Sequence, residues 1–217
     1  MLTVIVDYDS GNLHSAEKAF QRMAQEADAG QVLVTSEPDD VARADRIVLP
    51  GDGAFPACRN ALMQDRAGLY EAITEAAVMK GRPFLGICVG MQMMASVGRE
   101  YHDTPGFGWI EGEITKIIPD TPGLKVPHMG WNDLILTSPS TDKHPVLEGI
   151  ETGDHAYFVH SYQFDVRHFD ERAAHVDYGG EVTAIVARGT MIGTQFHPEK
   201  SQNTGLRLIS NFLKWAP

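Results

Sequence analysis

The chain has 217 residues, of which 43% are hydrophobic and 22% charged, and its formal net charge is −11 at pH 7. An acidic surface repels phosphate polymers and anionic lipids, so the charge argues against nucleic acid or a membrane as the main partner. No apolar run approaches a membrane span, the first residues lack the features of a signal peptide, and the two cysteines do not make a disulfide framework. We therefore expect one domain, residues 1–217, in a reducing cytoplasm.

Strands and helices alternate along the first hundred residues. Apolar, β-branched runs predict strands at residues 2–7, 32–35, 46–49 and 83–87. Helical spacing or a proline at the first turn predicts helices at residues 13–26, 38–43, 57–79 and 89–97, the third with a break near Gly68. This alternation, with nearly continuous apolar strands, indicates a parallel sheet covered on both faces.

The second half of the chain reads differently. Short strand-like runs follow one another at residues 113–118, 131–136, 156–164, 173–178, 182–187 and 191–196, and residues 187–192 read as a hairpin turn. Residues 201–215 close the chain as a helix that Ser201 is placed to cap. The expected fold is a three-layer α/β sandwich with a mixed, mostly parallel sheet.

Cys88 stands between two glycines, Gly86 and Gly90, where a predicted strand passes into a predicted helix. Flanking glycines permit a sharp bend that exposes the middle side chain above the sheet. The start of the helix supplies N–H groups and a positive dipole end, which favour a thiolate and a developing oxyanion. The pattern therefore predicts a nucleophile, and the alternative is a small buried cysteine at a crowded junction.

A thiol nucleophile needs a base, and the base needs a group that orients it. His197 follows an apolar strand, and in an extended His-Pro-Glu the side chain of Glu199 falls on the same side. His160 is a rival base, although its mid-strand position favours a buried ring with satisfied nitrogens. We found no metal-ligand spacing and no phosphate-binding glycine motif, so no metal or cofactor is expected.

Two stretches, GICVGMQ (residues 86–92) and QFHPEKS (residues 195–201), resemble the class I glutamine amidotransferases. Three more, at residues 7–15, 127–132 and 157–162, narrow the resemblance to the branch formed by the glutaminase subunits of imidazole glycerol phosphate synthase, in histidine biosynthesis. The resemblance covers essentially the whole chain. It implies a flavodoxin-like fold and the hydrolysis of glutamine to glutamate and ammonia.

The resemblance also implies a role for particular residues. Cys88 would attack the glutamine amide, His197 would act as base and acid, and Glu199 would orient His197. The N–H of Val89, with that of Gly53 after a loop rearrangement, would form the oxyanion hole. Bound glutamine would be held by Gln92, Ser161 and Tyr162.

A separate cyclase subunit with a (βα)8 barrel is the partner that the resemblance implies. It would use the ammonia to convert a phosphoribulosyl-formimino carboxamide nucleotide (PRFAR) to imidazole glycerol phosphate and an aminoimidazole carboxamide ribotide (AICAR). The subunit interface would be lined by Trp131, Tyr157 and Lys200. One position departs from the family pattern: Asp52 replaces the usual valine of PGVG, next to the expected oxyanion hole.

Two alternatives stay open at this stage. The same glutaminase chemistry would serve a synthase for pyridoxal phosphate, anthranilate or a guanine nucleotide, although residues 127–132 and 157–162 favour the histidine branch. A binding domain that kept the fold and lost turnover is the other alternative, and the presence of a cysteine, a histidine and a glutamate argues against it.

Overall fold

The structure is a computed structural model, and it describes residues 1–10, 13–66, 68–137 and 143–217. An eight-stranded sheet has the order β2-β1-β3-β4-β14-β13-β12-β9. Neighbours are parallel from β2 to β14 and antiparallel from β14 to β9. The strands are β2 (Gln31–Thr35), β1 (Leu2–Val6), β3 (Arg46–Gly51), β4 (Phe84–Cys88), β14 (Met191–Thr194), β13 (Glu181–Arg188), β12 (Arg172–Asp177) and β9 (Ile135–Leu136). The predicted mixed, mostly parallel sheet is confirmed.

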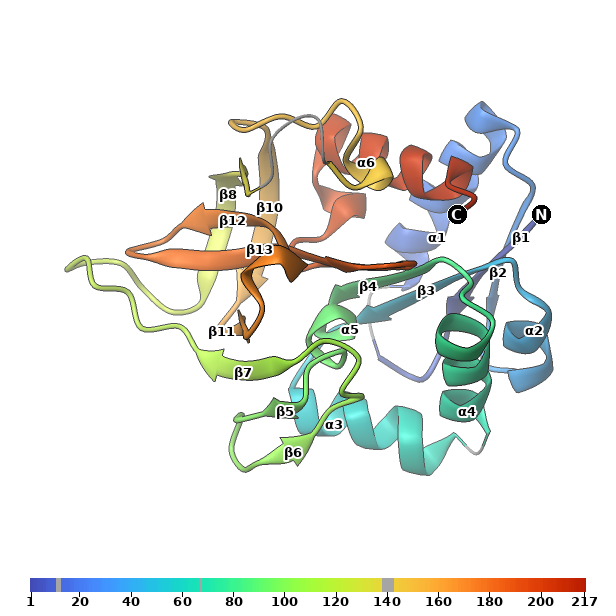
Figure 1. Cartoon of the computed structure of the whole chain (residues 1–217), viewed down its shortest axis with the longest axis horizontal. Helices are drawn as coiled ribbons and strands as arrows, with labels where there is room; N and C mark the ends of the chain where they lie inside the picture. Colours follow the sequence, from blue (N-terminus) through green and yellow to red (C-terminus); the bar gives the residue numbers. More distant parts are fainter. Residues whose placement is uncertain (11–12, 67, 138–142) are drawn as a thin grey trace.

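Helices cover both faces of this sheet and make the predicted three layers (Figure 1). One face carries α1 (Leu13–Ala27) and α6 (Gln202–Lys214), which pack against each other. The other face carries α2 (Pro38–Arg43), α3 (Phe55–Asn60) and α4 (Leu69–Thr74). The central strands β3 and β4 are buried along their whole length, which explains why their sequences are continuously apolar.

The predicted helix over residues 57–79 is divided as expected near Gly68, where φ is +80°. Its pieces are α3, a π-helical segment η1 (Ala61–Asp65), α4 and a second π-helical segment η2 (Glu75–Met79).

The helix predicted over residues 89–97 is much shorter, because α5 spans only Val89–Gln92. The N–H groups of Phe107 and Trp109 donate to the carbonyls of Met93 and Met94, at 2.7 and 3.0 Å, and so take the acceptors that a longer helix needs. The chain instead enters two strands that the sequence did not predict, β5 (Val97–Gly98) and β6 (Thr104–Pro105).

Two smaller sheets flank the main sheet, with orders β10-β8 and β11-β7-β5-β6. Their remaining strands are β10 (His155–His160), β8 (His128–Asp133), β11 (Tyr162–Val166) and β7 (Gly112–Lys116). The single strand predicted over residues 156–164 was therefore wrong, since the chain changes sheets at Ser161. The run at residues 131–136 is likewise divided at Leu134. Phe158 and Phe164 are both buried and an even number of residues apart, so the spacing of apolar residues gave no sign of the break at Ser161.

Candidate active site

Cys88 is the last residue of β4 and adopts φ +55° and ψ −113°, a conformation that is unfavourable for a side chain with a Cβ. The two glycines are required by close backbone approach. A Cβ at Gly86 would lie 2.7 Å from the carbonyl oxygen of Gly90, and a Cβ at Gly90 would lie 1.8 Å from that of Leu49. The predicted elbow is present, and α5 begins at the next residue.

A cavity of about 280 Å³ lies over the elbow. Only 6% of Cys88 is exposed, and its accessible part faces this cavity. The lining comes from the loop after β3, the elbow, the segment after β5, the residue before β8 and the β10–β11 junction: Asp52, Gly53, Cys88, Val89, Gln92, Glu100, Pro127, Val159, His160, Ser161 and Tyr162. Five predicted residues, Gly53, Val89, Gln92, Ser161 and Tyr162, are therefore brought together around the cysteine.

His197 and Glu199 meet beside Cys88. Nδ1 of His197 lies 2.9 Å from Oε1 of Glu199, and both side chains are buried. His197 is extended as we expected, but Glu199 lies in a 3₁₀ turn, η6 (Pro198–Lys200), because the N–H of Lys200 donates back to the carbonyl of His197. The carboxylate can only accept, so Nδ1 carries a proton and Nε2 is left for the sulfur.

Burial lowers the pKa of His197, but hydrogen bonds to Cys88 and Glu199, with their negative charges, outweigh burial and raise it well above its usual value. This environment favours an imidazolium at His197 beside the sulfur, the arrangement that a nucleophilic cysteine requires. His160 does not take this place. It is buried on β10, with Nδ1 bonded to the carbonyl of Tyr162 at 2.8 Å.

The backbone of the loop after β3 is held at Asp52 by hydrogen bonds to Ser10. Ser10 Oγ donates to the Asp52 carbonyl over 2.9 Å and accepts from the Asp52 N–H over 3.3 Å.

Ser201 has a different role from the one predicted. Its side chain does not cap α6, because its Oγ accepts from the N–H of Tyr157 and donates to the carbonyl of His197.

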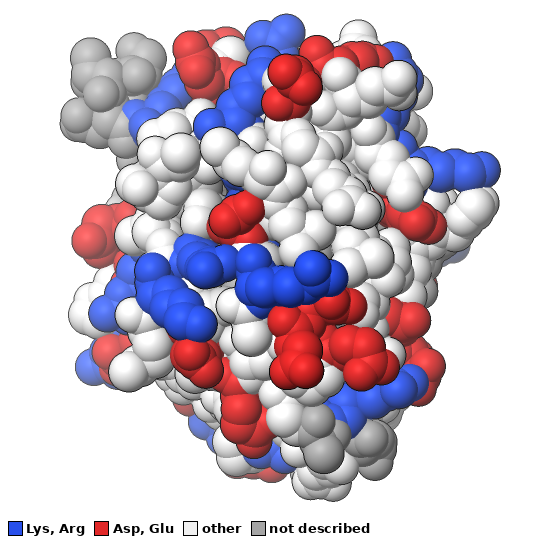
Figure 2. All heavy atoms as spheres, turned by 90° about the vertical axis from the view of Figure 1, so that its right-hand side faces the viewer, with Lys and Arg blue, Asp and Glu red and all other residues white. Residues whose placement is uncertain are grey.

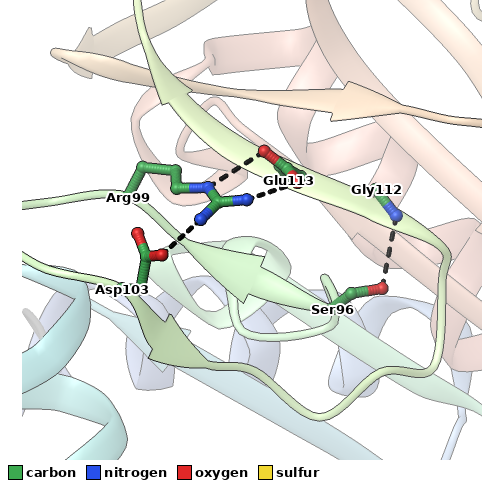
Figure 3. Close-up of polar contacts among 5 residues, drawn as sticks. All are labelled: Ser96, Arg99, Asp103, Gly112 and Glu113. Atoms are coloured by element: carbon green, nitrogen blue, oxygen red, sulfur yellow. Dashed lines mark hydrogen bonds and ion pairs between the residues drawn. The ribbon is translucent and has the colours of Figure 1, made fainter.

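Sequence reasoning missed Glu100, which lines the cavity and accepts the N–H of Phe55 over 2.7 Å. Its segment is fixed by Arg99, whose guanidinium bonds both oxygens of Glu113 on β7 and one oxygen of Asp103 (Figure 3). It missed Gln195 too, whose amide reaches the Cys88 sulfur. Glu100 has no local pattern, and Gln195 begins the QFHPEKS stretch without any local sign of a contact with sulfur, so only the folded chain reveals their positions.

The predicted interface residues lie on the outer side of the β10–β8 sheet and on η6. Trp131, which is 50% exposed, packs edge-on against Tyr157 with ring centroids 5.8 Å apart. Lys200 is half-buried at the end of η6. Among the residues that the structure describes, no group of three acidic, histidine or cysteine side chains is arranged to hold a metal ion. No described helix is long and apolar enough to cross a membrane.

The chain is similar to known proteins over essentially its whole length. Residues 4–215 match the family described as glutamine amidotransferase class-I. Two proteins named imidazole glycerol phosphate synthase subunit HisH, from Cereibacter sphaeroides and Ruegeria pomeroyi, are 71% and 64% identical to the chain over 217 residues, with full coverage of both sequences. A solved structure titled "Crystal structure of glutamine amidotransferase" has a TM-score of 0.71 at 18% identity, covers 97% of each chain and supports the fold alone.

Proposed function

Because the chain belongs to the class-I glutamine amidotransferase family, we propose that it is the glutaminase subunit of an imidazole glycerol phosphate synthase. The observation that carries the proposal is the strained Cys88 elbow, with the His197–Glu199 pair beside it and a cavity above it. The chain is 71% and 64% identical to the two HisH subunits over their full length, and this similarity supports histidine biosynthesis as the pathway that the activity serves.

The proposed reaction runs in two halves. The Cys88 thiolate attacks the side-chain amide carbon of glutamine, and the tetrahedral intermediate expels ammonia, which takes its proton from His197. A γ-glutamyl thioester remains. His197 then removes a proton from water, the hydroxide attacks the thioester, and glutamate leaves as the thiolate is restored. Glu199 keeps the ring in the productive orientation throughout and stabilises its positive form.

The polar lining suits glutamine. Glu100 presents a carboxylate for the α-ammonium group, and Ser161 and Tyr162 line the same cavity. The oxyanion hole is assigned to the N–H of Val89 and an N–H of the loop at Gly53. The Asp52 N–H is bonded to Ser10, so it contributes only if that loop turns.

We further propose that residues 1–217 form one domain of a cytoplasmic heterodimer. Its partner is a cyclase with a (βα)8 barrel, which uses the ammonia to convert PRFAR to imidazole glycerol phosphate and AICAR. The contact surface includes Trp131, Tyr157 and Lys200. Free ammonia is protonated in water and then loses its nucleophilicity, so direct delivery between subunits favours the second reaction.

The test is selective labelling by an electrophilic chloroketone analogue of glutamine, with the modified residue identified by mass spectrometry. We expect Cys88 to react at least tenfold faster than Cys58, which is also nearly fully buried, and excess glutamine to protect it. Cys88→Ser is expected to keep the fold and lose roughly a thousandfold or more of the glutaminase activity. Equal labelling of the two cysteines would contradict the proposal.

A further inference from the structure

Gln195 is fully buried and contacts the nucleophile. β14 runs parallel to β4 with Thr194 opposite Ile87. The residues that follow these two, Gln195 and Cys88, therefore lie side by side although they are 107 positions apart in the sequence. Nε2 of Gln195 lies 3.7 Å from Sγ of Cys88, within the range for a hydrogen bond to sulfur. The segment that delivers His197 therefore brings a second polar group to the same atom.

The orientation of the Gln195 amide follows from its neighbour. Nε2 of Gln92 lies 3.2 Å from the carbonyl oxygen of Tyr162, which can only accept, so this atom of Gln92 is a donor. The same nitrogen lies 3.0 Å from the Gln195 amide, which must present its oxygen there. The NH₂ group of Gln195 consequently faces the sulfur and donates to it.

The Tyr162 carbonyl is the end of a longer buried chain of hydrogen bonds. It also accepts from Nδ1 of His160 at 2.8 Å, so the other nitrogen of that neutral ring is an acceptor. Nδ1 of His128 lies 3.0 Å from this acceptor, Nε2 of His160, and must donate to it. Nε2 of His128 then accepts from Nδ2 of Asn132 at 3.3 Å.

Two further contacts fix the chain at its outer end. The Asn132 amide also donates to the Asp177 carbonyl over 3.0 Å, and its oxygen accepts the N–H of Asp133 over 2.8 Å. Burial lowers the pKa of His128 to about 4 and that of His160 to about 3, so both rings stay neutral near pH 7. Along the hydrogen-bonded chain from Asn132 on β8 to the sulfur of Cys88, each atom can therefore act only as a donor or only as an acceptor.

We propose that Gln195 is a catalytic residue whose side-chain N–H stabilises the Cys88 thiolate, and that the buried chain from Asn132 through His128, His160 and Gln92 holds its amide in the donating orientation. The same N–H stabilises the thiolate that is released when water cleaves the thioester. Gln92 and the two histidines are positioning residues, since they act through Gln195. This inference rests on the proposed function, because it needs a reacting sulfur at Cys88.

The test is the pH dependence of Cys88 alkylation by iodoacetamide in the full chain, with Gln195→Met and with Gln163→Met as the control. Gln163 lines a different cavity and should change nothing. Methionine has a similar length but no N–H donor, so we expect the midpoint of the alkylation profile to rise by about one pH unit. We also expect kcat/KM for glutamine to fall at least about tenfold. A purely structural role would not move the midpoint.

Other titratable groups also face Cys88, and these residues must be unaltered in the wild type and in every variant that is compared. They are His197 with Glu199, Tyr8 and Cys58, and the cavity residues Asp52, Glu100 and His160. A second variant, Gln195→Glu, keeps the acceptor toward Gln92 and places a negative charge by the sulfur. It should raise the midpoint further than methionine does.

An unchanged midpoint in a folded Gln195→Met or Gln195→Glu chain would overturn the inference. If neither variant folds, the wild-type chain decides: the NMR signal of the Gln195 amide protons should move when Cys88 is alkylated, and an unmoved signal overturns it. Failure of the wild-type cysteine to react selectively with the glutamine analogue would instead overturn the proposed function.

Discussion

At the scale of single residues, the site combines groups whose ordinary properties are changed by burial. His197 is driven toward its charged form by the sulfur and by Glu199, whereas His128 and His160 are driven toward their neutral forms by desolvation. The first change supports catalysis, and the second lowers the stability of the fold at acid pH.

The histidine pair makes stability fall as the pH falls. The pKa of His128 is lowered from 6.5 to about 4, so between these values the unfolded chain binds a proton that the folded chain does not. We expect about 2 kcal/mol of unfolding free energy to be lost at pH 5, relative to pH 7, through this residue. His128→Gln should lose correspondingly less over the same interval.

Urea unfolding at pH 7 and pH 5 measures this difference. His14→Gln is the matched control, because His14 is exposed on α1. The same acid-induced loss in the wild type and in His128→Gln would show that His128 is not held neutral.

Single residues were also the least predictable part of the site. The sequence identified Cys88, His197 and Glu199 because a glycine-flanked cysteine and a His-Pro-Glu run have local patterns. Glu100 has no such pattern, and the position of Gln195 at the start of QFHPEKS does not reveal its contact with sulfur. Glu100 reaches the cavity and Gln195 reaches Cys88 only because the segments that follow β5 and β14 pack beside the elbow.

At the scale of elements, the elbow depends on contact between two backbones. A Cβ at Gly90 in α5 would overlap the Leu49 carbonyl on β3, and β3 is held in place between β1 and β4. We therefore expect Gly90→Ala to cost at least about 3 kcal/mol of unfolding free energy and to abolish glutaminase activity.

Gly81→Ala separates this crowding from backbone strain. Gly81 has φ +63° but no neighbour within 4 Å of an added Cβ, so the substitution should cost only about 1–2 kcal/mol. Equal losses for the two variants in urea unfolding would contradict the crowding argument.

Elements with strong periodicity were predicted well, and elements set by tertiary contacts were not. α1, α2 and the β13–β14 hairpin follow directly from spacing and turn residues. The shortening of α5 and the change of sheet at Ser161 depend on partners far along the chain, which no local pattern records.

At the scale of the whole molecule, the two ends have different surfaces. The end that carries α2 and both termini shows basic and acidic side chains interspersed over its described surface (Figure 2). The opposite end carries the β10–β8 sheet, where Met129 and Trp131 are 65% and 50% exposed. Large exposed apolar and aromatic side chains of this kind favour a protein interface.

Trp131→Ala is expected to weaken binding of the cyclase at least about tenfold and to leave the unfolding free energy of the isolated chain within about 0.5 kcal/mol. Titration calorimetry with the cyclase measures the first quantity. Met79→Ala, a substitution of a residue 78% exposed on η2, is the control and should bind normally. Unchanged affinity for Trp131→Ala would place the interface elsewhere.

The central claim is that this chain releases ammonia from glutamine for a partner enzyme. Its most direct test is the rate of glutamate formation by the chain alone, and by the chain with the cyclase and its nucleotide substrate, each compared with Cys88→Ser. We expect slow hydrolysis by the chain alone, strong activation in the complex and no activity for the serine variant. Equal rates with and without the partner, or undiminished hydrolysis by Cys88→Ser, would contradict it.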